Sequence, residues 1–259
     1  MRKLMVGLVI FLMASIASSA VMKNPCKNKE YPKVMKQKTE ADFSKNDYYL
    51  ALDDILAVKK CDPKDPEVYY WLGRIYQARL EMGKAEENFL QAVQLNKNYS
   101  QVYMALGNLY LKQNKNERAL ENYQKAAGDD TYRDAYIAWN NIGWIYMLRD
   151  NLVDAEQAFL KSLAFQPGFC AAFCNMGELR AKQKRYAEAI IQFQKSSSLC
   201  PDYSRPHRLL GLEYNREGKV AEACSEFELA RKIAPADSDD GINAVKYLKI
   251  LNCPEQPGK

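Results

Sequence analysis

Seven cysteines and one histidine are the residues of this 259-residue chain that are best suited to chemistry. A cysteine nucleophile needs a nearby base, which is usually a histidine, and a structural zinc site needs about four Cys, His or carboxylate ligands. Cys170 and Cys174 have a spacing that could begin a metal site, but no Cys-x-x-Cys pair and no histidine cluster completes it. The sequence therefore predicts no metal, no cofactor and no catalytic site, and it favours a protein that is not an enzyme.

The distribution of charge argues against nucleic acid as the ligand. The formal net charge is only +5, and the Lys and Arg residues are interleaved with Asp and Glu residues along the chain. A nucleic-acid-binding protein normally gathers its positive charge in a patch or stripe. Apolar residues make up 47% of the chain and 17 residues are tyrosines, which indicates a folded protein rather than a disordered one.

The first 20 residues have the composition of an export signal. Arg2 and Lys3 precede an apolar run, residues 4–16, and small residues follow at positions 17–20 (Ala-Ser-Ser-Ala). This order predicts a secretory signal peptide, residues 1–20, that is cleaved after Ala20. An uncleaved anchor is the alternative, because residues 4–22 approach the ~20 apolar residues that span a bilayer.

A bacterial lipid anchor would require small residues directly before the modified cysteine. The first cysteine is Cys26, and residues 23–25 (Lys-Asn-Pro) precede it. We therefore expect an exported protein with no direct lipid anchor. Export to an oxidising compartment favours disulfides among the cysteines.

Three residue types recur with one period over most of the chain. Glycines lie at intervals of 34 or 36 residues, an alanine follows each glycine by 12 positions, and an aromatic residue follows each alanine by four. Small residues are expected where two helices cross closely, and the aromatic rings are expected to fill the gap between one helical hairpin and the next. The series are Gly73, Gly107, Gly143, Gly177 and Gly211; Ala85, Ala119, Ala155, Ala189 and Ala223; and Phe89, Tyr123, Phe159, Phe193 and Phe227.

The pattern resembles the tetratricopeptide repeat, a 34-residue helix–turn–helix unit. The resemblance implies an all-α fold, a right-handed α-solenoid of six helical hairpins with a C-terminal capping helix whose outer face is polar. The first unit departs from the pattern, because Thr39 and Ile55 take the glycine and aromatic positions. His207 takes the packing position of Trp139, so we expect it to be buried or half-buried. The fourth unit shows the pattern best, with Trp139, Ile142, Gly143, Tyr146, Ala155, Phe159 and Pro167.

The period fixes the expected organisation of the chain. The two residues added before the fourth unit lie in or near the turn-rich stretch 128–131 and should lengthen one connection. Ser238, Asp239 and Asp240 are candidates for the N-cap of the capping helix. The expected segments are a signal peptide (1–20), an N-terminal segment (21–31), six repeat units in residues 32–237 (32–65, 66–99, 100–135, 136–169, 170–203 and 204–237), a capping helix (238–252) and a tail (253–259).

The repeat also brings particular cysteines together, because the start of the first helix of a hairpin lies near the end of the second. It predicts three disulfides, Cys26–Cys61, Cys170–Cys200 and Cys224–Cys253, and it leaves Cys174 free. Cys174 lies one turn further along the same helix than Cys170 and is the competing partner for Cys200.

In this family the first helices of the hairpins line a concave groove that binds a protein or peptide, and the resemblance carries that role to particular positions. The middle of this groove is expected to be apolar and aromatic, and the C-terminal end of the groove is expected to be basic. Ile137 and Met147 could equally be core residues, as apolar residues at helical spacing usually are. The family's carboxylate clamp is incomplete, because Arg74 stands alone where a Lys-Asn pair would begin. The predicted partner-binding residues are Tyr70, Arg74, Met104, Asn108, Asn140, Trp144, Met147, Glu178, Arg205 and Arg208.

A finer resemblance points to the pilotins of type IV pilus biogenesis. It rests on six units after an export signal, on the longer link before the fourth unit (GDDTYRDAYIAWNNIGWIYM) and on the stretch that follows (PGFCAAFCNMGELRAKQKRYAEAIIQFQKSSSLCPDYSRPHRLLG). Pilotins bind the outer-membrane secretin subunit and help it form its ring. The resemblance therefore implies a periplasmic scaffold for secretin or pilus assembly, held at the outer membrane through its partner. Typical pilotins are lipoproteins, however, and this chain lacks the lipid site. The alternative is another periplasmic adaptor, such as a cell-envelope or division-associated regulator.

Overall fold

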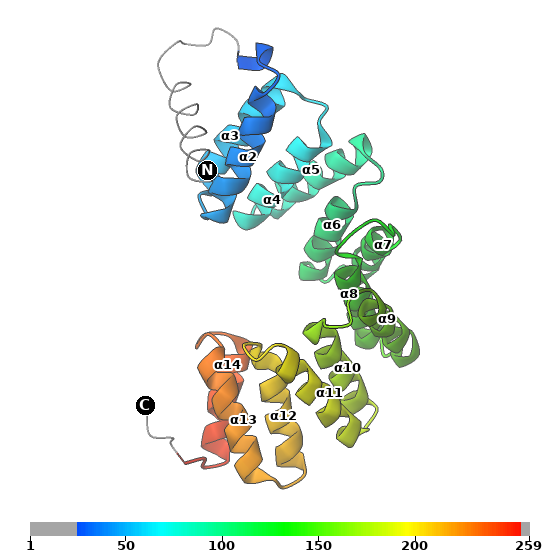
Figure 1. Cartoon of the computed structure of the whole chain (residues 1–259), viewed down its shortest axis with the longest axis vertical. Helices are drawn as coiled ribbons and strands as arrows, with labels where there is room; N and C mark the ends of the chain where they lie inside the picture. Colours follow the sequence, from blue (N-terminus) through cyan, green and yellow to red (C-terminus); the bar gives the residue numbers. More distant parts are fainter. Residues whose placement is uncertain (1–24, 255–259) are drawn as a thin grey trace, which may run out of the picture. The chain divides into compact units, whose positions relative to one another are not determined.

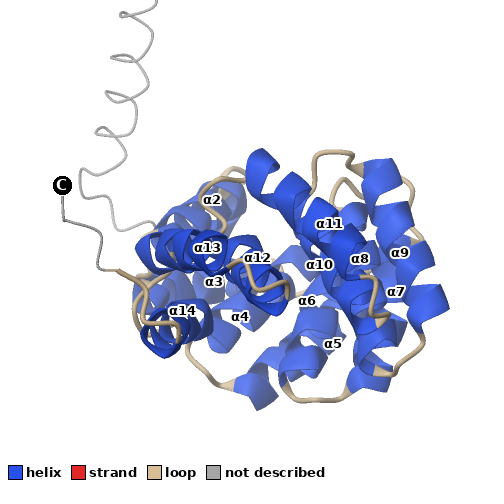
Figure 2. Ribbon diagram, turned by 90° about the horizontal axis from the view of Figure 1, so that it is seen from below, coloured by secondary structure: helices blue, strands red, loops and turns tan. Residues whose placement is uncertain are grey.

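The structure, a computed structural model, describes residues 25–254. In that range the backbone forms one short 3-10 helix and thirteen α-helices and no β-strand (Figures 1 and 2). None of these helices has the length and apolarity that a membrane span requires. The predicted signal peptide, residues 1–20, lies outside the described residues.

The chain divides into two compact units. The first unit extends to Asn96 and contains η1 (Pro25–Lys27), α2 (Tyr31–Ser44), α3 (Tyr48–Cys61), α4 (Pro66–Ala78) and α5 (Met82–Leu95). The second unit begins at Lys97 and contains α6 (Ser100–Lys112), α7 (Asn116–Ala127), α8 (Ala135–Leu148), α9 (Leu152–Phe165), α10 (Cys170–Lys182), α11 (Tyr186–Leu199), α12 (Ser204–Arg216), α13 (Val220–Ile233) and α14 (Asp239–Ile250).

Successive helices pack as hairpins within each unit. α2 packs on α3 and α4 on α5 in the first unit, and the pairs α6 and α7, α8 and α9, α10 and α11, and α12 and α13 follow in the second (Figure 1). The last helix, α14, packs on α13 and α12. This arrangement confirms the predicted all-α array of six hairpins with a C-terminal helix.

The glycines of the repeat lie directly against the aromatic rings. A Cβ atom added to Gly143 would lie 2.6 Å from the ring of Phe159, and one added to Gly107 would lie 2.5 Å from the ring of Tyr123. Each ring thus presses on the glycine of its own hairpin, whereas the sequence had placed the rings between hairpins. The ring needs the space that a side chain would take, which explains why glycine and aromatic residues share one period.

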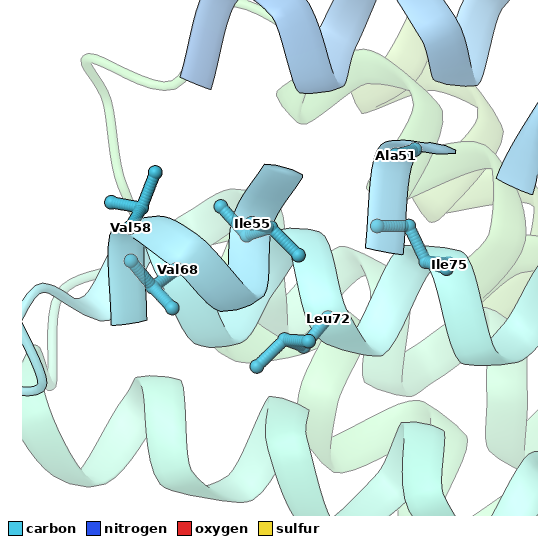
Figure 3. Packing of buried hydrophobic residues seen from close by; sticks show 6 residues of the cluster. All are labelled: Ala51, Ile55, Val58, Val68, Leu72 and Ile75. Carbon is cyan, nitrogen blue, oxygen red and sulfur yellow. The ribbon is translucent and has the colours of Figure 1, made fainter. Parts of the chain in front are cut away.

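The first hairpin uses a different pair at these two positions. Thr39 and Ile55 are both fully buried, and the Thr39 hydroxyl donates to the Met35 carbonyl at 2.9 Å. In this hairpin Thr39, which is larger than glycine, thus occurs together with Ile55, which is smaller than an aromatic residue, so the two changes in volume offset each other. Ile55 belongs to a cluster that α3 and α4 form together (Figure 3), made of Ala51, Ile55, Val58, Val68, Leu72 and Ile75.

One turn geometry joins the two helices of every hairpin. The second residue after the end of each first helix has a positive φ, between 58° and 75°. The N–H of the next residue then donates to the carbonyl five positions earlier, as Glu81 does to Tyr76 at 2.9 Å. This pattern closes the helix by a Schellman motif. The positive-φ residues are Asn46, Leu80, Asn114, Asp150, Lys184 and Gly218.

The longer link lies where the sequence predicted it. α7 ends at Ala127 and α8 begins at Ala135. Within the link the Asp129 carboxylate accepts from the Ser100 hydroxyl at 2.5 Å and from the backbone N–H of Thr131 at 3.0 Å. These hydrogen bonds, with the Ser100 bond the strongest cause, hold the pKa of Asp129 below its usual value. The extra residues therefore form an ordered connection.

The capping helix α14 begins as predicted, because the Ser238 side chain accepts from the N–H of Gly241 at 3.2 Å. Tyr247 stacks on Phe227 with ring centroids 5.0 Å apart, which covers the last aromatic ring of the repeat. The outer face of α14 is less polar than the sequence predicted, since Ile242 and Ile250 on this helix are 54% and 58% exposed.

The structure forms the same three disulfides that the sequence predicted. They are Cys26–Cys61, Cys170–Cys200 and Cys224–Cys253, with Cα atoms 5.0, 6.1 and 5.6 Å apart. Cys174 is free and buried.

Candidate protein-binding groove

The first helices of the second unit line a hollow of about 350 Å³. Its apolar part comes from α8, α10 and α12 together with Phe193 of α11, and Leu148 at the end of α8 is 52% exposed. Two of the predicted partner-binding residues, Met147 and Glu178, contribute to it. The lining residues, named together as the α8–α12 groove, are Met147, Leu148, Glu178, Ala181, Lys182, Phe193, Leu209 and Glu213.

Arg205 links three of the first helices beside this groove. Its guanidinium lies 4.9 Å from the centre of the Trp144 ring and 2.6 Å from the Glu178 carboxylate. Burial raises the pKa of Glu178 above its ordinary value, although the positive charges of Arg205 and Arg208 oppose that effect. The structure therefore brings together four residues that the sequence selected: Trp144, Glu178, Arg205 and Arg208.

The C-terminal end of the groove is not a free basic patch. Arg208 Nε lies 2.5 Å from a carboxylate oxygen of Asp240, and Arg205 already holds Glu178. Ser204 adds a hydrogen bond of 2.9 Å to the same Asp240 carboxylate. The prediction of a basic C-terminal end is therefore wrong, because the positive charges of Arg205 and Arg208 are neutralised by carboxylates of the second unit.

Three predicted partner-binding residues contribute little accessible surface. Met104, Asn140 and Met147 are all buried. Met147 packs in a core cluster with Phe159, as the core alternative for it had allowed. Asn140 accepts a hydrogen bond of 2.8 Å from the Asn175 amide. That bond ties α8 to α10 inside the unit.

The remaining predicted residues lie elsewhere. Asn108 is exposed and accepts from the hydroxyl of Tyr123 at 2.7 Å, so it supports a buried ring. Tyr70 and Arg74 belong to the first unit, where Arg74 donates to the Tyr70 hydroxyl at 2.8 Å.

Six of the eight groove residues were not among the predicted partner-binding residues: Leu148, Ala181, Lys182, Phe193, Leu209 and Glu213. Helical spacing could have found three of them, because residues four apart share a helix face. Lys182 follows Glu178 by four positions, and Leu209 follows Arg205 in the same way. The Lys182 ammonium is held by the Met147 carbonyl at 2.9 Å and by Asp150 at 2.9 Å.

The lone histidine and the free cysteine occupy packing positions. His207 is 9% exposed, and its Nδ1 lies 2.7 Å from a Glu226 carboxylate oxygen. Burial raises the pKa of the Cys174 thiol to about 12 and that of Tyr203 to about 12. Within residues 25–254 no three His, Cys, Asp or Glu side chains are grouped so that they could hold a metal ion.

The Cys174 thiol is expected to be nearly inert in the native protein. With a pKa of about 12 its thiolate fraction is only about one in 10⁴ at about pH 8, and the side chain has no exposed surface. Ellman's reagent should therefore react only after unfolding in guanidinium without reductant, and it should then report a single thiol. Fast reaction of the native chain would contradict the burial, and further thiols in denaturant would contradict the pairing.

Two family models, both described as "Tetratricopeptide repeat", match residues 104–168 and residues 66–99 and 171–203, which together make up just over half of the chain. The anaphase-promoting complex subunit CDC16 of Saccharomyces cerevisiae is 26% identical over 176 residues, which is 63% of this chain and 20% of that protein. The type IV pilus assembly protein PilF of Pseudomonas aeruginosa is 22% identical over 128 residues, 49% of this chain and 51% of PilF. The matched region thus spans only a fifth to a half of these relatives.

Two solved structures share the fold over most of the chain. PilW, a widely conserved type IV pilus biogenesis factor, has a TM-score of 0.72 at 23% identity, over 84% of this chain and 100% of PilW. PilF of Pseudomonas aeruginosa has a TM-score of 0.72 at 17% identity, over 84% of this chain and 97% of PilF. Together with the hairpins and the glycine–aromatic pairs, the family match shows that this chain belongs to the tetratricopeptide-repeat family.

Proposed function

We propose that this protein is a non-enzymatic scaffold for type IV pilus assembly and that it binds an outer-membrane secretin subunit. One observation carries the proposal: the likeness in fold to PilW and PilF extends over 100% and 97% of those chains. Neither pilus protein has a substantial part without a counterpart here. In the solved APC/C hetero-tetramer Cut9-Hcn1, by contrast, the likeness in fold covers only 43% of the matching chain.

The disulfides support a periplasmic location. Structural disulfides form in oxidising compartments and are rare in the bacterial cytosol. This chain has one such disulfide in its first unit and two in its second, and each joins the ends of helical elements. A protein that acts at an outer-membrane pore from the periplasm would meet these conditions, and the predicted signal peptide would supply the route.

The α8–α12 groove supports protein binding at a particular surface. Stable interfaces have an apolar centre surrounded by polar groups. Leu148 and Leu209 supply apolar surface, and the Arg205–Glu178 pair lies at its edge. Half-buried Trp144, with Arg205 over its ring, adds an aromatic anchor of the kind that dominates binding energy. An amphipathic helix or an extended segment of the partner would fit such a surface.

Deletion of the gene tests the pilus assignment. We expect the deletion strain to lose most of its heat-stable secretin multimers, measured by immunoblotting of membranes, and wild-type protein to restore them. The variant Leu148→Asp should fail to restore them, because a carboxylate in the groove would lose its hydration when the partner binds.

The matched control is Val153→Asp. Val153 lies in the same unit, on α9, and is 73% exposed, but it does not line the groove. This variant should restore the multimers fully. Normal multimers and normal pili in the deletion strain would overturn the pilus assignment and favour another periplasmic adaptor. Full rescue by Leu148→Asp would overturn the groove as the binding surface.

A further inference from the structure

Arg74 in α4 differs from the other buried or half-buried arginines of residues 25–254. Arg79, Arg180, Arg205 and Arg208 each lie within 2.9 Å of a carboxylate oxygen. Arg74 is likewise half-buried, but no described carboxylate pairs with it. A charge that is partly removed from water without a counter-ion is costly, so this position needs an explanation.

Aromatic rings surround the Arg74 guanidinium. It lies 4.9 Å from the ring centre of Phe43, 5.7 Å from that of Tyr70 and 6.0 Å from that of Trp71. Phe43 comes from α2 and the other two rings from α4, so the group belongs wholly to the first unit. The Phe43 and Trp71 rings meet edge to face at 5.7 Å, which gives them a defined orientation.

The contacts of Arg74 leave most of its hydrogen-bonding capacity free. A guanidinium carries five N–H donors in one plane. Nη1 donates to the Tyr70 hydroxyl at 2.8 Å, and this is the hydrogen bond that Arg74 makes within the described chain. The rings lie around the guanidinium and limit the access of water, which strengthens any ion pair that forms there.

We propose that Arg74 and the rings of Phe43, Tyr70 and Trp71 form a receptor for a side-chain carboxylate of a partner protein. A carboxylate matches the planar fork of arginine in two parallel hydrogen bonds, and apolar residues beside it would pack on the rings. The proposal gives the chemistry of the partner segment and rests on the proposed function only in that the ligand is a protein.

A side chain fits this site better than a chain terminus. Clamps for a terminal carboxylate combine several cations and amides, but Lys36, Lys38 and Arg79 of the first unit already pair with carboxylates. The nearest candidate in the repeat frame, Asn108, belongs to the second unit, and its side-chain oxygen already accepts from Tyr123. The partner segment is therefore an internal one that carries Asp or Glu between apolar residues.

An NMR titration of the full mature chain tests the receptor through the Nε–H signal of Arg74, assigned by its loss in Arg74→Lys. The probe is a six-residue peptide, blocked at both ends, with one glutamate between leucine and phenylalanine. We expect a saturable shift of the Arg74 signal and at least about tenfold weaker binding of the same peptide with glutamine, since a charged acceptor roughly doubles the strength of the hydrogen bonds. A third peptide, with glutamine and a free C-terminal carboxylate, should bind as weakly as the glutamine peptide.

Arg79→Lys is the matched control, because Arg79 also lies over a tyrosine ring, that of Tyr49 at 4.7 Å, but already holds Glu81. It should leave peptide binding unchanged, whereas Arg74→Lys, monitored through the backbone signals of α4, should weaken it at least about tenfold. An unmoved Arg74 signal at millimolar peptide, or an equal loss in Arg79→Lys, would overturn the receptor. Tight binding of the third peptide would overturn the side-chain assignment. If deletion of the gene removes the secretin multimers but the Arg74 signal does not move with peptide, the pilus assignment stands and only the carboxylate receptor is contradicted.

Discussion

Replacing Gly143 with alanine is expected to lower the free energy of unfolding by about 1–3 kcal/mol. A Cβ atom there would lie 2.6 Å from the ring of Phe159 and 3.0 Å from the carbonyl oxygen of Ala155. Phe159 is fully buried, so its ring has no free space into which to move, and the carbonyl belongs to the backbone of α9. The two helices of the hairpin must therefore separate. Urea denaturation followed by circular dichroism measures the loss.

Gly83→Ala is the control for helix propensity. Gly83 lies in α5, and a Cβ atom there would meet nothing within 4 Å. Alanine should stabilise this site by up to about 1 kcal/mol, because it loses less backbone entropy than glycine in a helix. In the double variant Gly143→Ala/Phe159→Leu the smaller side chain makes room, so the loss should be smaller than the sum of the two single losses. Equal effects at Gly83 and Gly143 would contradict the steric explanation.

In the first hairpin a larger residue at the glycine position already occurs together with a smaller residue at the aromatic position. Thr39 and Ile55 stand at the glycine and aromatic positions, and both are fully buried. The period of small and aromatic residues was therefore sufficient to predict the hairpins, even where one unit departs from it. The reason is physical: the hairpin requires a certain total volume between its helices, and several pairs of side chains provide it.

The turns within the hairpins could not be predicted in the same way. Six residues adopt a positive φ at one position of the repeat, but they include Leu80 and Lys184, whose residue types rarely adopt that conformation. Gly218, Asn46 and Asn114 carry the usual signals for a helix that ends in this way, whereas Leu80 and Lys184 do not. The packing of the two helices imposes the turn, so local sequence preference is overridden by contacts that are distant in sequence.

The charge pairs of the candidate site show a similar limit. The repeat frame selected Arg205 and Arg208 correctly as residues of the first helices, but it did not give their partners. Glu178 lies on α10 and Asp240 on α14, and their proximity depends on how each helix is rotated about its axis. The frame likewise placed Asn140 at a groove position, whereas the structure turns it toward Asn175. Position in a repeat predicts the element and the approximate face, and side-chain contacts decide accessibility.

Removal of the Cys170–Cys200 disulfide is expected to cost roughly 2–4 kcal/mol of unfolding free energy. The bond closes a loop across 30 residues and so restricts the unfolded chain. The Ser196 hydroxyl also donates to the Cys170 carbonyl at 2.8 Å, so the ends of α10 and α11 keep a contact without the bond. We therefore expect the variant Cys170→Ala/Cys200→Ala to retain its native helix content by circular dichroism and to unfold at lower urea concentration.

Both cysteines must be replaced, because Cys174 lies one turn from Cys170 on α10 and would become available to Cys200 in a single variant. The control is Cys224→Ala/Cys253→Ala, whose bond spans 29 residues, so the restriction on the unfolded chain is nearly the same. The two losses should nevertheless differ, because Cys253 follows the terminal helix α14, which can detach without unfolding α10 and α11. The Cys170–Cys200 variant should therefore lose more stability. An unchanged urea midpoint for that variant, or a non-reducing peptide map that joins Cys174 to Cys200, would contradict this account.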